Sequence, residues 1–179
     1  PIQLRGGRLL VPFVVQKWLR PGREVSPSDD YFRSHLFSSE DDGRTWSQTS
    51  KFTDQTTEPS LLELPTGELV ASVRYQRDKV PEDPSELATD ARLYSGIGSP
   101  SDLGCQLFQN TAFTRSQDGG RTWATPKIVT ATAQQSGSIL RLSDGTLILT
   151  FGRYGQRFML SYDCGSSWSR SVYQVYRCG

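Results

Sequence analysis

Short runs of apolar residues alternate with turn-forming segments along the chain, and no segment shows the spacing of an amphipathic helix. One pattern occurs three times: an apolar run, a turn centred on glycine, and a second apolar run. The three copies lie at residues 2–11, 61–71 and 139–149. Two apolar runs around a glycine turn are typical of a β-hairpin, so each copy is predicted to form a pair of antiparallel strands.

A second repeat follows each hairpin and has the form S-x-D-x-G-x-[ST]-W. Its copies, called the turn motifs from here on, are Ser39–Trp46, Ser116–Trp123 and Ser161–Trp168. Short strands are expected on both sides of each copy, for example at 112–115 and 126–129 around the second. A hairpin and the two strands that flank a turn motif make a four-stranded antiparallel unit. Repeated four-stranded units predict an all-β protein with a β-propeller fold.

The repeats divide the chain into units at about 1–52, 58–130 and 136–176. The distance between hairpin and turn motif differs among the copies, so the insertions fall between the second and third strands. The longest, residues 76–107, is predicted to be a long inserted loop. Because strands in a unit are antiparallel, these insertions lie at the edge of the sheet opposite the turn motifs. Variable loops on a rigid scaffold are a common place for binding sites.

Charged side chains gather at that opposite edge. Glu58 precedes the first strand of the second unit and Arg74 ends its second strand, so the hairpin returns both residues to one edge. In the third unit, Arg153 and Arg157 flank the corresponding connection. Arginine binds carboxylates through its planar fork of donors. The sequence therefore predicts a site for a carboxylate ligand, with Glu58 as the candidate base.

The turn motif is the Asp-box, and the chain resembles the sialidase (neuraminidase) superfamily, whose blades carry this motif. The resemblance implies a ring of six blades, of which this chain supplies about three. The chain starts at Pro1 without an initiating Met, and we expect it to be a fragment of a longer protein. The motif aspartates Asp41, Asp118 and Asp163 are expected to be structural, and neither a metal nor another cofactor is expected.

For the site, the resemblance implies retaining cleavage of a terminal sialic acid or a related acidic sugar. Glu58 would activate a Tyr nucleophile, and Arg74 and Arg157 would bind the sugar carboxylate, with Arg153 as the competitor of Arg157. The remaining family residues, an Arg, an Asp acid and the Tyr itself, are expected outside these residues, so the chain alone should be inactive. Two alternatives stay open: a non-catalytic Asp-box propeller that binds glycans or proteins, and a propeller enzyme with another substrate.

Composition narrows the function classes. The chain has 20 Lys and Arg against 19 Asp and Glu, a net charge of +1, which argues against a nucleic-acid binder with a clustered basic face. The longest apolar run, Leu9–Val15, is shorter than the roughly 20 residues of a membrane span. Cys105, Cys164 and Cys178 form no C-x-x-C pair, so no zinc site is expected. No signal peptide is visible, and a secreted or periplasmic location is left open.

Overall fold

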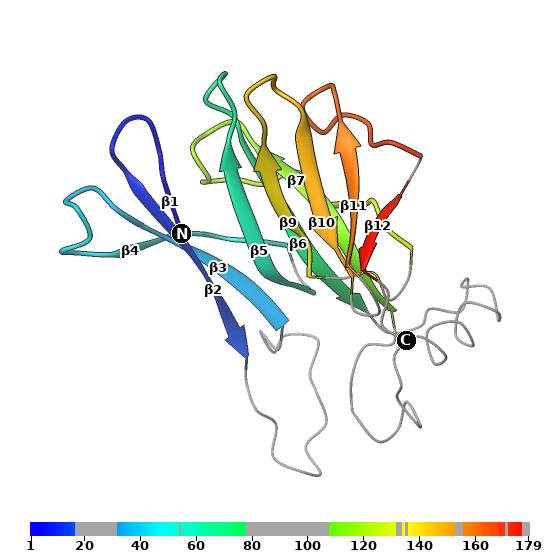
Figure 1. The fold of residues 1–179 in the computed structure, drawn as a ribbon. Coiled ribbons are helices and arrows are strands. Elements are labelled where there is room, and N and C mark those ends of the chain that lie inside the picture. Colours follow the sequence, from blue (N-terminus) through cyan, green and yellow to red (C-terminus); the bar gives the residue numbers. More distant parts are fainter. Residues whose placement is uncertain are drawn as a thin grey trace, which may run out of the picture.

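The computed structural model describes residues 1–16, 32–53, 55–77, 108–131, 134, 136–152, 156–170 and 172–176. Within these residues the chain forms twelve strands, which are arranged as three successive four-stranded units (Figure 1). The described part of the chain contains no helix with the length and apolar character needed to cross a membrane.

In each unit the strands pair antiparallel in chain order. The first unit consists of β1 (Ile2–Gln3), β2 (Leu9–Gln16), β3 (Phe32–Ser39) and β4 (Ser47–Lys51). The second consists of β5 (Thr56–Glu63), β6 (Leu69–Arg77), β7 (Phe108–Ser116) and β8 (Lys127–Ile128). The third consists of β9 (Ser138–Arg141), β10 (Leu147–Phe151), β11 (Gln156–Ser161) and β12 (Tyr173–Tyr176).

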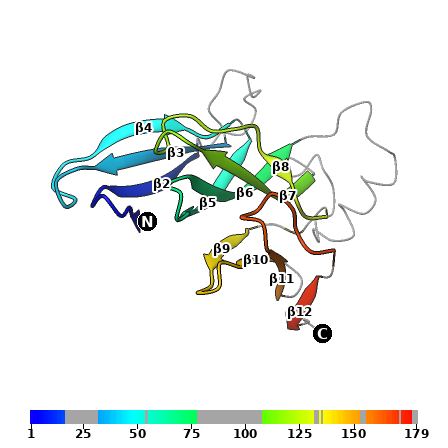
Figure 2. The same ribbon diagram turned by 90° about the horizontal axis from the view of Figure 1, so that it is seen from above.

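This arrangement is the all-β, propeller-type fold that the repeats predict. One parallel pair, Arg33 with Thr56, joins β3 to β5 and links the first two units, while the third unit is a separate sheet. Seen from above, the third unit stands at an angle to the second (Figure 2). Strand β6 continues to Arg77, two residues into the predicted insertion at 76–107, and the remainder of that insertion lies outside the described residues.

The core lies between neighbouring units, and β6 is buried on both of its faces. Leu69, Ala71 and Val73 pack toward the first unit, in a cluster that also contains Leu10 and Leu36. The alternate residue Val70 joins a second cluster with Leu64, Phe113, Ile139 and Leu147 of the second and third units. Successive side chains of a strand point to opposite faces, so one strand contributes to both interfaces. The packing of neighbouring units therefore fixes where the strand ends lie.

The turn motifs have the same internal hydrogen bonds in all three copies. In the first, the Asp41 carboxylate accepts bonds from the Thr45 amide (2.8 Å), the Thr45 hydroxyl (2.6 Å) and the Ser39 hydroxyl (2.7 Å). These bonds, led by the one from the Thr45 hydroxyl, lower the pKa of Asp41 from 3.8 to about 2. Asp118 and Asp163 make the equivalent bonds, and their pKa values are lowered in the same way. The geometry is that of carboxylates engaged within their own turns.

Two of the motif tryptophans pack against the preceding unit. Trp123 stacks on Phe52 with ring centroids 4.5 Å apart, and Trp168 meets Phe113 edge-on at 5.3 Å. Trp46 of the first copy is 43 % exposed and donates its indole N–H to the Gly43 carbonyl at 2.9 Å. Aromatic pairs of this geometry stabilise beyond the area they bury, so the motif joins units as well as closing a turn.

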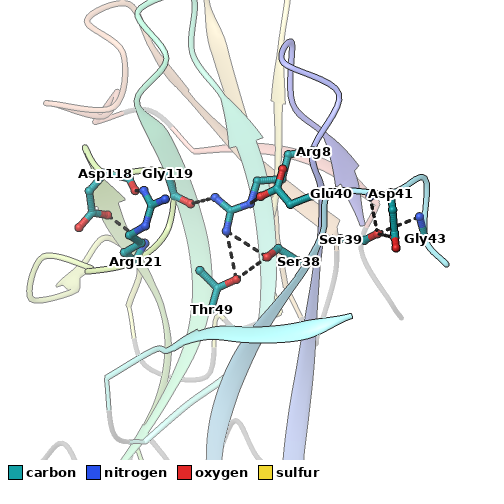
Figure 3. Close-up of polar contacts among 10 residues, drawn as sticks. All are labelled: Arg8, Ser38, Ser39, Glu40, Asp41, Gly43, Thr49, Asp118, Gly119 and Arg121. Carbon is teal, nitrogen blue, oxygen red and sulfur yellow. Dashed lines mark hydrogen bonds and ion pairs between the residues drawn. The ribbon is translucent and has the colours of Figure 1, made fainter. Parts of the chain in front are cut away.

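An arginine also crosses each of the two interfaces, on the side of the turn motifs. Arg8 donates to the Gly119 carbonyl of the second turn motif at 2.9 Å (Figure 3). Its other terminal nitrogen donates to the hydroxyls of Ser38 (3.0 Å) and Thr49 (3.1 Å), and Glu40 pairs with its Nε at 2.9 Å. The Arg8 guanidinium is thus held by its own unit while it bonds the next one.

Arg115 makes the corresponding contact between the second and third units. It donates to the Cys164 carbonyl at 2.6 Å and to the Ser166 hydroxyl at 3.3 Å, both in the third turn motif. Glu68 of the same unit accepts a bond from its other terminal nitrogen at 2.9 Å. Gly119 and Cys164 occupy the same position of the turn motif, directly before its glycine. Both interfaces therefore carry an arginine bond to the same backbone carbonyl.

Candidate functional site

Glu58 and Arg74 lie together at the edge opposite the turn motifs, as the hairpin predicts, but Glu58 is the third residue of β5 and does not precede the strand as expected. Arg74 pairs across the hairpin with Thr57, and its guanidinium donates to Glu58 Oε1 at 2.7 Å. The pairing of β5 with β6 shifts register between Thr57 and Ser60, next to Glu58. The Arg74 side chain is 19 % exposed and that of Glu58 is 42 % exposed. The ion pair is therefore anchored on its arginine side and open to solvent on its carboxylate side.

The backbone at Glu58 is in the left-handed region, with φ at +50°. This conformation costs a residue other than glycine about 1–2 kcal/mol. Such strain persists where the surroundings fix the residue, and it is common at functional sites. The shift of register and the positive φ together set the direction in which the Glu58 side chain leaves the strand.

Ser136, in the connection between β8 and β9, completes the environment of Glu58. Its hydroxyl donates to Glu58 Oε2 at 2.5 Å, across 78 positions of sequence. Ser136 also has a positive φ, +62°. Both oxygens of the carboxylate thus have a donor, Arg74 on Oε1 and Ser136 on Oε2, and the second donor comes from the next unit.

The next residue, Gly137, holds this connection against the second unit. Its carbonyl accepts a bond from the buried hydroxyl of Ser72 at 2.8 Å. A Cβ at this position would lie 2.5 Å from the Thr111 methyl group, so only glycine allows the backbone to come this close. Ser60 supports the same contact by accepting a bond from the Ile139 amide at 3.2 Å. Ser136 is therefore placed by fixed backbone contacts.

Arg157 contacts Gln134, which lies two residues before Ser136 in the chain. The Arg157 guanidinium donates to the Gln134 side-chain oxygen at 2.5 Å. The Gln134 carbonyl in turn accepts bonds from the Thr111 amide (2.8 Å), the Thr111 hydroxyl (3.0 Å) and the Thr130 hydroxyl (2.6 Å). Thr111 pairs with Arg74 across β6 and β7. The arginines of the two units are therefore joined by a short series of bonds through β7.

The site contains two residues that sequence reasoning missed, Ser136 and Gln134. The stretch from Thr130 to Ser138, rich in Thr, Gln and Ser, is the only sequence feature that marks them, and it does not distinguish a site residue from a surface residue. The fourth predicted residue, Arg153, lies outside the described residues. In the described ranges no three His, Cys, Asp or Glu side chains come together as metal ligands.

The two arginines differ in their electrostatic surroundings. The charge of Arg74 is balanced directly by Glu58. Arg157 is held by a neutral amide, and no carboxylate of the described part of the chain forms an ion pair with it. A guanidinium fixed by a neutral partner keeps its full charge for an anionic ligand. The arrangement offers one positioned carboxylate and, on the neighbouring unit, one cation that has no carboxylate partner among the described residues.

The comparisons with known proteins identify the fold. No family model matches the chain, and none of the curated proteins matches it. Several solved structures match the chain. The Penicillium chrysogenum α-L-arabinanase complexed with arabinobiose aligns with a TM-score of 0.61 and 18 % identity, and the alignment covers 97 % of this chain and 47 % of the arabinanase. A Hadza microbial sialidase aligns at 0.56 with 19 % identity, covering 93 % and 35 %. The Trypanosoma rangeli sialidase aligns at 0.52 with 15 % identity, covering 98 % and 24 %.

These structures are glycoside hydrolases, and the chain spans about half of their length or less. Identities below 20 % leave the substrate unassigned, because one fold carries many activities. The chain therefore shares the propeller-type fold of glycoside hydrolases, a group that includes sialidases and enzymes acting on arabinose-containing sugars.

Proposed function

We propose that this chain forms part of a retaining glycoside hydrolase of the sialidase type, which removes terminal sialic acid or a related acidic sugar from glycoconjugates. The observation that carries the proposal is the Glu58 carboxylate, fixed by Arg74 and Ser136 with a positive backbone φ. A structural ion pair does not require a strained backbone, whereas a reacting group must be held in one direction.

In this reaction Glu58 acts as the base that activates a Tyr nucleophile, in keeping with the resemblance to sialidases. A neutral Tyr is suited to an anomeric centre that already carries a carboxylate, because an ionised Asp or Glu nucleophile would be repelled. Glu58 takes the phenolic proton as the Tyr oxygen attacks the anomeric carbon, the bond from that carbon to the leaving-group oxygen breaks, and the Asp acid expected outside these residues protonates that oxygen. Water then attacks the anomeric carbon of the covalent glycosyl-enzyme, the bond to Tyr breaks, the Tyr oxygen regains its proton from Glu58, and the sugar leaves with retained configuration. Arg157, whose charge is uncompensated among the described residues, binds the sugar carboxylate together with Arg74, and Arg153 stays a candidate for the same role.

A second candidate substrate is a neutral arabinose-containing sugar. Arg74 is already neutralised by Glu58 at 2.7 Å, which weakens its attraction for a substrate carboxylate. The arabinanase also aligns with a higher TM-score than the two sialidases. A third candidate is a non-catalytic propeller that binds glycans. Such a protein would not need a carboxylate held in one direction by a strained backbone.

The test is hydrolysis of two probes by the complete protein, a fluorogenic sialoside and a nitrophenyl arabinofuranoside. We expect hydrolysis of the sialoside, a loss of at least about a hundredfold in Glu58→Gln, and a raised KM in Arg74→Ala and Arg157→Ala. Glu63→Gln is the matched control, because it alters an Arg–Glu pair at 3.4 Å on the side of the turn motifs. Hydrolysis of the arabinofuranoside alone would select the second candidate. Binding without turnover, or full activity in Glu58→Gln, would overturn the assignment.

A further inference from the structure

We propose that Ser136 is a positioning residue for Glu58, and that the connection between β8 and β9 thereby sets the active geometry of the site. The inference rests on the proposed function and adds to it a residue from the neighbouring unit. Its basis is the contact of the Ser136 hydroxyl with Glu58 Oε2 at 2.5 Å.

The backbones of both partners support this role for Ser136. Glu58 and Ser136 both have positive φ, +50° and +62°, a backbone conformation that is strained for residues other than glycine. Glycine at position 136 would remove its share of that strain. Backbone preference therefore does not explain why this residue is a serine. The serine differs from glycine by its hydroxyl group, which is the group that contacts Glu58.

The contact of Ser136 with Glu58 adds little to the stability of the fold. The Glu58 side chain is 42 % exposed, and hydrogen bonds and ion pairs between exposed groups add little to folding stability. The connection is already attached without this contact, through the Gly137 carbonyl to Ser72 and through the Gln134 carbonyl to Thr111 and Thr130. The bond from Ser136 fixes a carboxylate direction more than it holds the fold together.

Ser136 also lies close in sequence to the residue that holds Arg157. Gln134, which binds the Arg157 guanidinium, is two residues from Ser136 in the same connection. Two residues span at most about 7 Å of extended chain. A single short segment therefore holds the base of the second unit and the cation of the third at a limited distance from each other, as a substrate bridging the two units requires.

The test compares Ser136→Gly with Ser136→Ala in the complete protein. Both variants lack the hydroxyl, but only glycine relieves the positive φ. We expect the same loss of kcat in both variants, about ten- to hundredfold on whichever of the two sugar probes the wild type hydrolyses, with KM nearly unchanged. Thermal stability should differ, with Ser136→Gly at or above the wild type and above Ser136→Ala. Ser138→Ala, two residues further along the chain at the first position of β9, is the control and should keep wild-type kcat.

A purely structural role predicts a different order, in which kcat follows the thermal stability of each variant. That result, or wild-type kcat in Ser136→Gly, would overturn the inference. A crystal structure of Ser136→Gly provides a readout that needs no turnover: the Glu58 carboxylate should leave its single direction and occupy more than one rotamer. If the wild type hydrolyses neither probe, the proposed function fails, and the Glu58 rotamer alone decides the positioning role. An unchanged rotamer would refute it.

Discussion

Replacing Gly165 by alanine tests the packing of the third turn motif against the second unit. Gly165 has a φ of +82°, and a Cβ at this position would fall on the ring of Phe113, only 2.7 Å from its Cε1 atom. Phe113 is 5 % exposed and packs edge-on against Trp168, so its ring has little room to move. Gly43 occupies the same motif position with the same φ of +82°, but its nearest neighbours would be in ordinary contact at 3.6 Å.

The two substitutions therefore share the backbone cost and differ in the steric cost. Alanine in the left-handed region costs about 1–2 kcal/mol, and overpacking a filled core adds about 1–3 kcal/mol. We expect Gly43→Ala to cost about 1–2 kcal/mol and Gly165→Ala about 2–5 kcal/mol. At about 2–4 °C per kcal/mol for a domain of this size, Tm should fall by about 2–8 °C in the first variant and by about 4–20 °C in the second.

Thermal unfolding followed by near-ultraviolet circular dichroism, which reports on tryptophan packing, measures both variants. Phe113→Leu in the Gly165→Ala background should recover part of the loss, because the smaller side chain vacates the space that the new methyl group needs. A double-mutant cycle should then give a coupling energy of at least about 1 kcal/mol, as expected for residues in contact. Equal losses in the two alanine variants, or a coupling energy near zero, would refute this account of the interface.

Three further predictions concern the interfaces between units and the stability of the fold at low pH. Arg115→Met should lower Tm by several degrees, because it leaves the Cys164 carbonyl without its charged donor; an unchanged Tm would show that water replaces the bond at no cost. Trp123→Leu should lower Tm and the near-ultraviolet signal together, since the indole stacks on the preceding unit; a lower Tm with an intact signal would contradict this. Because the hydroxyl and amide of Thr45 hold the pKa of Asp41 at about 2, below its ordinary 3.8, the stability that Asp41 contributes is complete above about pH 4 and is lost as pH falls toward 2. Asp41→Asn should therefore narrow the difference in Tm between neutral and acidic solution, and an unchanged difference in the variant would disprove the linkage.

The features that the sequence predicted well depend on local chemistry. The turn motif contains its own acceptors, donors and positive-φ glycine, so its structure follows from a few consecutive residues. The contact of Glu58 with Arg74 was also predictable, although 16 positions separate them, because the hairpin register brings them to one edge. In an antiparallel hairpin, the separation of two residues from the turn determines whether they lie next to each other.

The features that the sequence did not predict arise between units. Ser136 reaches Glu58 across 78 positions, and no repeat, spacing or charge marks that serine as a partner. The same holds for Gln134, whose role follows from a backbone carbonyl bonded to Thr111 and a side chain turned toward Arg157. Such contacts depend on the angle and separation of two packed sheets, which are set by core side chains on both sides. A pattern read along one strand does not contain that information.

The arginine contacts on the side of the turn motifs also depend on how the units pack. Arg8 and Arg115 bond equivalent carbonyls, those of Gly119 and Cys164, yet they do not align in the repeat. The position of Arg8 is taken by Glu68 in the second unit, and the position of Arg115 carries a serine in the first. The two positions are diagonal neighbours on adjacent strands, because Ser38 pairs with Leu10 and Arg115 pairs with Val70. A guanidinium starting from either position therefore reaches the same point on the next unit. Both interfaces therefore have a guanidinium at the same place in space, although the arginines occupy different positions of the repeat. For this reason an alignment of the hairpins and turn motifs reveals the units but does not reveal the bonds that join them.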